Sequence, residues 1–203
     1  MKKKDTRRLV AIGILASVAT VLMFLEIPLW FTPGFYKIDL SEIPVLLGAF
    51  AFGPGAGVLI EVVKVIVNTA IEGTTTMGVG EIANFLIGLS FVLPASFIYY
   101  KQKTRKRAII GLSAGILSMV VVGAILNAFI LLPAYAYFLS TAEVVYTVDS
   151  FVYLGSLVNP LVKDLPTFIM FAVVPFNLVK GVLTSIIVIL IYKRISSLIK
   201  SHD

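Results

Sequence analysis

The stretch TFIMFAVVPFNLVKGVLTSIIVILIYKR, residues Thr167 to Arg194, decides the class of this protein. Its part from 168 to 192 contains a single charged residue, Lys180, and is long enough to cross a bilayer, which takes about 20 mostly apolar residues. Asn177 and Lys180 lie three residues apart and so share one face of a helix. Because polar side chains inside a span are costly, they usually face a bundle interior or a cavity. The stretch therefore predicts a membrane helix that carries an amide and an ammonium group toward a buried site.

The whole chain has the composition of an integral membrane protein. Of its 203 residues, 59% are apolar and 14% are charged, against roughly 45–50% and about 25% in an average soluble domain. Besides 168–192, the segments that can form spans are 9–29, 43–53, 55–71, 82–100 and 108–132. We therefore predict an all-α integral membrane protein. Residues 1–203 are expected to form one domain, a single compact bundle of six transmembrane helices.

Basic residues predict which way this bundle faces. Thirteen of the 17 Lys and Arg residues lie in the N-terminal segment, in the loop KQKTRKR (residues 101–107) and in the C-terminal segment. Cytoplasmic loops hold such an excess. An even number of spans must then separate the first two basic segments, so segment 43–53 is expected to cross although it is short. Both termini are expected on the cytoplasmic side of the cell membrane. The basic start before an apolar run also resembles a signal peptide, but the apolar segments that follow favour a retained span.

Several kinds of chemistry are excluded by what the sequence lacks. There is no cysteine and only one histidine, His202, so a disulfide, a thiolate metal site and a His-rich metal site are excluded. The Gly-rich stretch GPGAGVLIEVVK (Gly53–Lys64) lacks the G-K-[ST] ending of a P-loop. No set of nucleophile and base stands in a suitable context. We expect no catalytic residue, no metal, no bound cofactor and no nucleic-acid partner.

The polar residues inside the predicted spans favour a binding site. Asn84, Asn127 and Asn177 fall in three different spans, each in the outer half, and Lys180 lies near mid-depth. Each Asn could simply bond to a neighbouring helix, but four such groups at one level favour a shared site. Binding pockets are mostly apolar with a few convergent polar groups. These groups suit a neutral or weakly polar ring compound.

Three further features are a charged pair within a span, an outer loop and a long connecting segment. Glu61 and Lys64 are three residues apart and are expected to neutralise each other on one helix face, with a ligand role as the alternative. The outer loop WFTPGFYKID (Trp30–Asp39) carries a Pro-Gly turn between aromatic residues. It could fold over a cavity mouth as a lid, or its aromatics could form an interfacial belt. The connection 133–167 is expected to contain an amphipathic helix on the membrane surface.

Four motifs in chain order resemble one family. They are FYKIDLSEIPVLLGAFAFGPGAGVLIEVVKVIVN (Phe35–Asn68), GEIANFLIG (Gly80–Gly88), ILNAFILLPAYAYF (Ile125–Phe138) and PFNLVKG (Pro175–Gly181). Together they resemble the riboflavin-specific substrate-binding subunit of the energy-coupling-factor (ECF) vitamin transporters, from about residue 9 to residue 192. The most specific parts are D-x-S-[DE]-I-P at 39–44, GP-x-x-G at 53–57, and N-x-x-K in the last span.

The resemblance implies a six-helix protein that binds riboflavin with high affinity near its outer face and delivers it for uptake. Asn177, Lys180 and Asn127 would hydrogen-bond the flavin, and Asn84 would line the site. The capping loop would contribute Tyr36, Ile38, Asp39 and Leu40. The implied partners are riboflavin, a transmembrane coupling subunit, two cytoplasmic ATPase subunits and the lipid bilayer. Small residues of the first span would dock on the coupling subunit, either Gly13 and Ser17 or Ala16 and Thr20. The alternatives are another vitamin or small ring compound as ligand, or a structural membrane protein without one.

Overall fold

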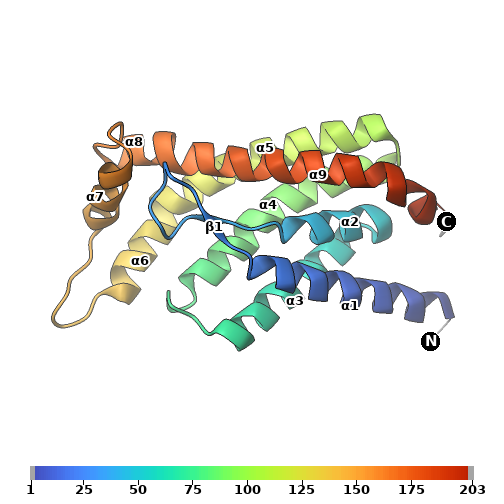
Figure 1. Ribbon diagram of the computed structural model, residues 1–203, viewed down its shortest axis with the longest axis horizontal. Helices are drawn as coiled ribbons and strands as arrows, with labels where there is room; N and C mark the ends of the chain where they lie inside the picture. Colours follow the sequence, from blue (N-terminus) through green and yellow to red (C-terminus); the bar gives the residue numbers. More distant parts are fainter. Residues whose placement is uncertain (1–2, 201–203) are drawn as a thin grey trace.

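The protein is an all-helical bundle with one very short hairpin. The computed structural model describes the backbone of residues 3–200 and the side chains of residues 5–191. The long helices lie roughly along one direction (Figure 1). The elements in chain order are α1 (Lys3–Met23), β1 (Ile27–Pro28), β2 (Lys37–Ile38), α2 (Glu42–Phe52), α3 (Pro54–Glu72), α4 (Val79–Lys101), α5 (Arg105–Leu126), the π-helical turn η1 (Asn127–Leu131), α6 (Leu132–Leu139), α7 (Val148–Val158), α8 (Leu165–Phe168), the π-helical turn η2 (Ile169–Val173) and α9 (Val174–Lys200).

Five helical segments among the described residues are long and apolar enough to cross a membrane. They are 5–23, 54–72, 79–101, 105–139 and 165–191. Two of them run without interruption through a π-helical turn, because α5, η1 and α6 form one rod, and α8, η2 and α9 form another. Five of the six predicted spans thus correspond to helices of sufficient length. The predicted boundaries for the fifth span, 108–132, were too short at both ends.

The sixth predicted span, 43–53, is not confirmed as a crossing. It is α2, which has 11 residues and is therefore about 16 Å long at 1.5 Å per residue, against a hydrocarbon core about 30 Å thick. Nine of its residues are buried, and it packs against α1, α3, α4 and α9. A helix of this length and apolarity is typical of a bundle core. It nevertheless runs back toward the end of the molecule where α1 begins (Figure 1).

We call that end of the bundle the closed end and the opposite end the cavity end. The closed end holds the first turn of α1, the turn at Gly53 and Pro54, and the loop 102–104 between α4 and α5 (Figure 1). The last turns of α9 lie there too. Residues 1–2 and 201–203 fall outside the described part. Only the adjoining helices, α1 and α9, therefore bear on the predicted position of the termini. All three predicted basic segments adjoin this end.

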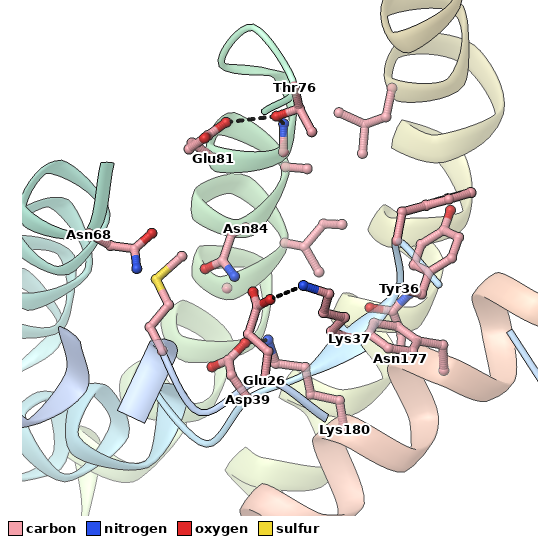
Figure 2. A pocket seen from close by; sticks show the side chains of 18 of the residues that line it. Glu26, Tyr36, Lys37, Asp39, Asn68, Thr76, Glu81, Asn84, Asn177 and Lys180 are labelled. Carbon is pink, nitrogen blue, oxygen red and sulfur yellow. Dashed lines mark hydrogen bonds and ion pairs between the residues drawn. The ribbon is translucent and has the colours of Figure 1, made fainter. Parts of the chain in front are cut away.

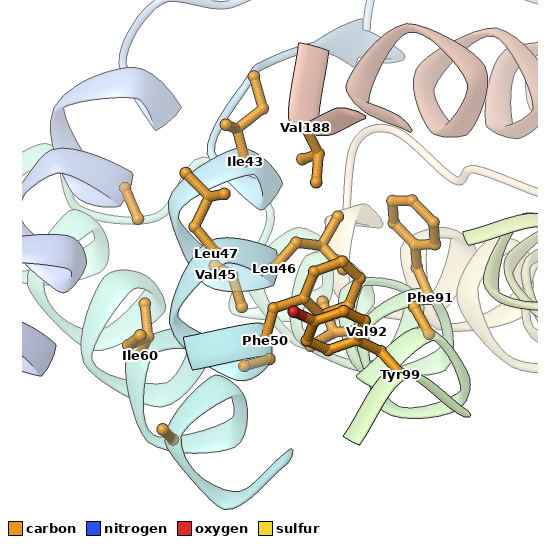
Figure 3. Packing of buried hydrophobic residues seen from close by; sticks show 14 of the residues in the cluster. Ile43, Val45, Leu46, Leu47, Phe50, Ile60, Phe91, Val92, Tyr99 and Val188 are labelled. Atoms are coloured by element: carbon orange, nitrogen blue, oxygen red, sulfur yellow. The ribbon is translucent and has the colours of Figure 1, made fainter. Parts of the chain in front are cut away.

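The closed end has a core of buried aromatic and aliphatic side chains. Phe50 and Tyr99 stack with ring centroids 4.3 Å apart, surrounded by fully buried side chains from α2, α3 and α4 (Figure 3). Glycines bring α4 and α5 together there: a Cβ atom on Gly111 would lie 2.5 Å from the carbonyl oxygen of Ala95, and one on Gly115 would lie 2.5 Å from that of Phe91. No larger residue fits at these two positions without moving a backbone.

Both π-helical turns are followed by a proline. Pro133 lies two residues after η1 and Pro175 two residues after η2. A proline inside a helix has no N–H for the carbonyl four residues earlier, and its ring crowds that carbonyl. A π-helical turn is one way for a helix to absorb this conflict, and such turns often occur at functional sites. At Pro175 the affected carbonyl belongs to Phe171, and the side chain of Asn159 donates a hydrogen bond to it at 3.1 Å.

The predicted amphipathic helix in the connection 133–167 is α7, which begins at a capping box formed by Thr147 and Ser150. Its buried face, with Phe151 and Val152, packs on α6, α8 and η2. Its opposite face exposes Tyr153 and Leu157. The helix is confirmed, while its contact with a membrane surface stays a prediction. The segment lies at the far end of the bundle from the first turn of α1, beside α6 and α8 (Figure 1).

Candidate functional site

A cavity of about 410 Å³ opens at the cavity end of the bundle. Ligand pockets are typically about 300–1,000 Å³, so a compound of several fused rings fits its size. Its wall is drawn from the segment 23–42 and from α3, α4, α5, η1, α6 and α9 (Figure 2). Six of the eight predicted ligand residues line it: Tyr36, Asp39, Asn84, Asn127, Asn177 and Lys180.

The remaining two predicted residues do not line the cavity. Ile38 is buried and pairs with Ile27 in the β1–β2 hairpin. Leu40 packs against the apolar core. Successive side chains of an extended chain point to opposite sides, so Asp39 faces the cavity while its two neighbours face away. Only alternate residues of the predicted capping stretch from Lys37 onward are therefore available to a ligand.

Lys180 is paired with Asp39, which the sequence did not indicate because the two residues are 141 positions apart. Its Nζ donates a hydrogen bond to Oδ2 of Asp39 at 2.7 Å, and both side chains are buried. Burial by itself would raise the pKa of Asp39, but the charges of Lys180 and Lys64, with hydrogen bonds from Lys180 and Ser41, lower it to about 2. The carboxylate is therefore ionised at neutral pH, and the pair adds no net charge to the cavity.

Tyr36 connects the capping segment to the wall of the cavity. Its hydroxyl donates a hydrogen bond to Oδ1 of Asn127 at 2.5 Å, and its ring packs near Phe168 and Phe176. Burial, followed by the influence of Tyr135, raises the pKa of Tyr36 well above 10, so the hydroxyl remains a donor at physiological pH. Together with the Lys180–Asp39 pair, this bond ties the segment 36–39 to η1 and to α9.

The two amides beside the π-helical turns are held by their own helices. Nδ2 of Asn127 donates to the carbonyl of Gly123 at 2.8 Å, and Nδ2 of Asn177 donates to that of Val173 at 2.9 Å. Gly123 also makes room for Asn177, because a Cβ atom there would lie 2.9 Å from Nδ2 of Asn177. The side chains are thus fixed in orientation before any ligand arrives, which limits the entropy lost on binding.

Asn84 presents an acceptor that no described group satisfies. Its Oδ1 is buried and accepts no hydrogen bond. An unpaired buried acceptor is costly unless a donor reaches it. Asn84 lines the cavity on α4, on the wall opposite Lys180 (Figure 2). It is therefore a candidate contact for a hydroxyl or N–H group of a ligand.

The mouth of the cavity carries polar residues that were not predicted as site residues. Lys37 bridges to Glu26 at 2.7 Å, and this partner raises the pKa of Lys37. Thr76 donates to Glu81 at 3.0 Å, and Glu72 also lines the cavity. Glu26 had been included in the predicted span 9–29, and nothing in the local sequence marked the others as part of the site. The mouth offers many acceptors to a ligand rich in hydroxyl groups.

The predicted pairing of Glu61 with Lys64 is confirmed, with Nζ of Lys64 2.7 Å from Oε1 of Glu61. Glu42 was missed as a member of this group because it was counted with the outer loop. It lies 2.9 Å from the same Nζ. All three side chains are buried, at the floor of the cavity, where Glu42 and Gly88 line it.

The small residues proposed for docking are divided by the structure. Ala16 and Thr20 are 1% and 4% exposed and pack inside the bundle, so a partner cannot reach them in this arrangement, which corrects that half of the prediction. Gly13 and Ser17 are exposed, and nothing lies within 4 Å of a Cβ atom built on Gly13. They follow one another on the outer face of α1. Only this pair remains available for contact with another helix.

Known proteins share both this sequence and this fold. Residues 7–192 match the family described as "ECF transporter, substrate-specific component". The chain belongs to this family. It is 34% identical to the riboflavin transporter RibU of Staphylococcus aureus (strain TCH60), over 98% of this chain and 96% of that protein. It is 30% identical to the riboflavin transporter FmnP of Bacillus subtilis (strain 168), over 97% of this chain and 95% of that protein.

A solved structure described as "Structure and mechanism of the S component of a bacterial ECF transporter" has the same fold. It aligns with a TM-score of 0.73 at 33% identity, over 97% of this chain and 99% of that chain. The resemblance inferred from the four motifs is therefore confirmed. As a substrate-specific component of an ECF transporter, the chain is a membrane transport protein and not an enzyme.

Proposed function

We propose that this chain binds riboflavin with high affinity and hands it to an ATP-driven coupling module for uptake. The proposal is supported by the names of its relatives and by the chemistry of the cavity. The observation that carries it is the neutralised Lys180–Asp39 pair among three amide side chains. An isoalloxazine ring is uncharged and carries carbonyl and N–H groups, which amides recognise, while its ribityl chain carries hydroxyl groups that suit the acceptors at the mouth.

The partners follow from the family and from what the sequence lacks. A substrate-specific component needs a source of energy, and no P-loop is present in this sequence. We assign ATP hydrolysis to two cytoplasmic ATPase subunits and the membrane contact to a transmembrane coupling subunit that docks on Gly13 and Ser17. We propose that the chain is a multi-pass protein of the cell membrane with both termini in the cytoplasm, which the basic segments near the closed end support.

Riboflavin titration of the purified protein tests the proposal. Binding is followed by quenching of flavin fluorescence, first with the unaltered chain and then with Asn177→Ala and Asn84→Ala. Each lost hydrogen bond is expected to weaken binding by about 0.5–1.5 kcal/mol, or up to roughly tenfold. Gln102→Ala, which removes an amide at the closed end, should leave affinity unchanged.

Competition separates riboflavin from other ligands of the same fold. Riboflavin should displace any other vitamin at equal concentration. A vitamin that displaces riboflavin instead would move the assignment to that compound. Failure of every ring compound to bind would support the alternative of a structural membrane protein.

A further inference from the structure

The floor of the cavity contains more buried negative than positive charge. The charged groups that face one another there come from four elements: Asp39 from the segment after β2, Glu42 from α2, Glu61 and Lys64 from α3, and Lys180 from α9. Helix α4 also lies against the cluster, at Gly88. Three carboxyl groups thus meet two ammonium groups. If all five were ionised, one negative charge would be uncompensated.

Such a charge is costly because the side chains around Lys64 are almost completely buried. Glu61 and Lys64 are 0% exposed and Glu42 is 1% exposed. An unpaired ionised carboxylate in this environment normally becomes neutral by taking up a proton. Two carboxyl groups that share one site do so most readily, because one ionised group disfavours ionisation of the other.

The contacts of Lys64 show which carboxyl oxygens lack a donor and could therefore hold a proton. The ammonium of Lys64 donates hydrogen bonds to Oε1 of Glu42 at 2.9 Å and to Oγ of Ser41 at 3.1 Å. Its Nζ also lies 2.7 Å from Oε1 of Glu61 in an ion pair. Oε2 of Glu42 and both carboxyl oxygens of Glu61 are buried, and none of the three accepts a hydrogen bond from a described residue.

Gly88 brings these two carboxyl groups against the same point of α4. A Cβ atom on Gly88 would lie 2.7 Å from Oε1 of Glu42 and 2.7 Å from Oε1 of Glu61. Any other residue would therefore push the carboxyl groups apart. The absence of a side chain at Gly88 thus leaves room for the two carboxyl groups to lie close together.

We propose that Glu42 and Glu61 form a proton-binding site that holds one proton at neutral pH. Glu42 is the first residue of α2, where the positive end of the helix dipole stabilises a negative charge. Glu61 lies in the middle of α3 and has no such support, so it carries the proton. Because Glu42 lines the cavity, the proton exchanges with the solution through the cavity. The nearby ammonium of Lys64 disfavours a metal ion in the same place.

Infrared spectroscopy of the full-length protein tests this site without any ligand. The carbonyl stretch of a protonated carboxyl group is expected at neutral pH, with the intensity of one group per chain. Glu61→Gln should abolish it. Glu42→Gln should abolish it too, because Glu61 alone then ionises against Lys64. Glu72→Gln, the same change on the same helix at the exposed rim, should leave the band unchanged.

Further variants and conditions give results that oppose the proposal. Lys64→Met removes one positive charge and should raise the signal to two groups per chain. Glu61→Gln should melt close to the unaltered protein, since Gln has the shape of the protonated acid; its failure to fold would contradict the proposal. So would absence of the band at neutral pH, or its survival in Glu42→Gln. A missing band together with a melting temperature that rises with Na⁺ would place a metal ion between the acids instead.

Discussion

The two ends of the bundle are built from the same helices but solve opposite problems. At the closed end, Gly111 and Gly115 let α5 lie directly on the backbone of α4, and aromatic and aliphatic side chains fill the interior. At the cavity end, the π-helical turn η1 joins α5 to α6 before Pro133 and η2 joins α8 to α9 before Pro175, and buried polar groups surround a cavity. Close packing makes one end rigid, and fixed polar groups make the other able to bind.

The largest effect is expected from removing the charge that balances Asp39. Lys180→Met leaves the carboxyl group of Asp39 buried at the cavity end without its ion-pair partner, and breaking a buried pair in this way costs about 3–5 kcal/mol of folding free energy. Thermal unfolding in detergent measures the loss. Adding Asp39→Asn to Lys180→Met should recover most of the stability, while ligand affinity stays weak. A single variant as stable as the unaltered chain would show that the pair has no structural role.

The closed end should respond to a single methyl group. Gly111→Ala places a Cβ atom 2.5 Å from the carbonyl oxygen of Ala95, and overpacking of this kind costs about 1–3 kcal/mol. The matched control is Gly13→Ala, where nothing lies within 4 Å and where alanine favours the helix. The melting temperature should fall for the first variant and hold or rise for the second. Equal melting temperatures would mean that α4 and α5 separate easily.

A smaller effect, on affinity alone, is expected at the proline of α9. Pro175→Ala restores an N–H that can bond to the carbonyl of Phe171 and removes the reason for the π-helical turn. Asn177 and Lys180 then turn relative to the cavity, and ligand affinity should fall by roughly tenfold, which is about 1.4 kcal/mol. Pro94→Ala in α4, a proline with no π-helical turn beside it, should leave affinity unchanged. Fluorescence titration distinguishes the two variants, and equal affinities would separate the π-helical turn from binding.

The smallest effect is expected from mild acid. The folded-state pKa of Asp39 is lowered to about 2, below its usual value of about 3.9. Its ion pair therefore stabilises the protein fully above about pH 4, and this contribution is lost as the pH falls from there toward 2. The contribution of this ion pair to melting temperature and affinity should not change between neutral pH and about pH 4. In Asp39→Asn the loss below pH 4 should be reduced; an identical acid profile would exclude Asp39 as its source.

Much of the fold was accessible from apolar length alone, because each long helix must satisfy the same bilayer. The short helix α2 could not be interpreted in this way, because apolar composition does not distinguish a core helix from a span. Its position among α1, α3, α4 and α9 depends on tertiary packing. The π-helical turns could not be predicted from the sequence either. A proline signals a disturbed helix, but whether it bends, breaks or widens is decided by neighbours such as Asn159.

The polar residues of the site were largely predictable because polar groups in apolar segments are rare. Asn84, Asn127, Asn177 and Lys180 stood out for this reason, and all four line the cavity. The ion pairs that the buried lysines form did not stand out. Asp39 and Glu42 lie in a stretch that reads as a polar loop followed by a helix start, and only the fold shows that Lys180 and Lys64 meet them. Pairing across 141 residues leaves no local trace.

The bond from Asn159 to the carbonyl of Phe171 joins the segment after α7 to the last of the long rods. That rod begins with α8, beside α7, and continues to the closed end (Figure 1). A tilt imposed on the rod at the closed end is transmitted along a stiff helix to this anchor. The segment after α7 must then move with the rod or the bond must break, so the fold couples its two ends mechanically.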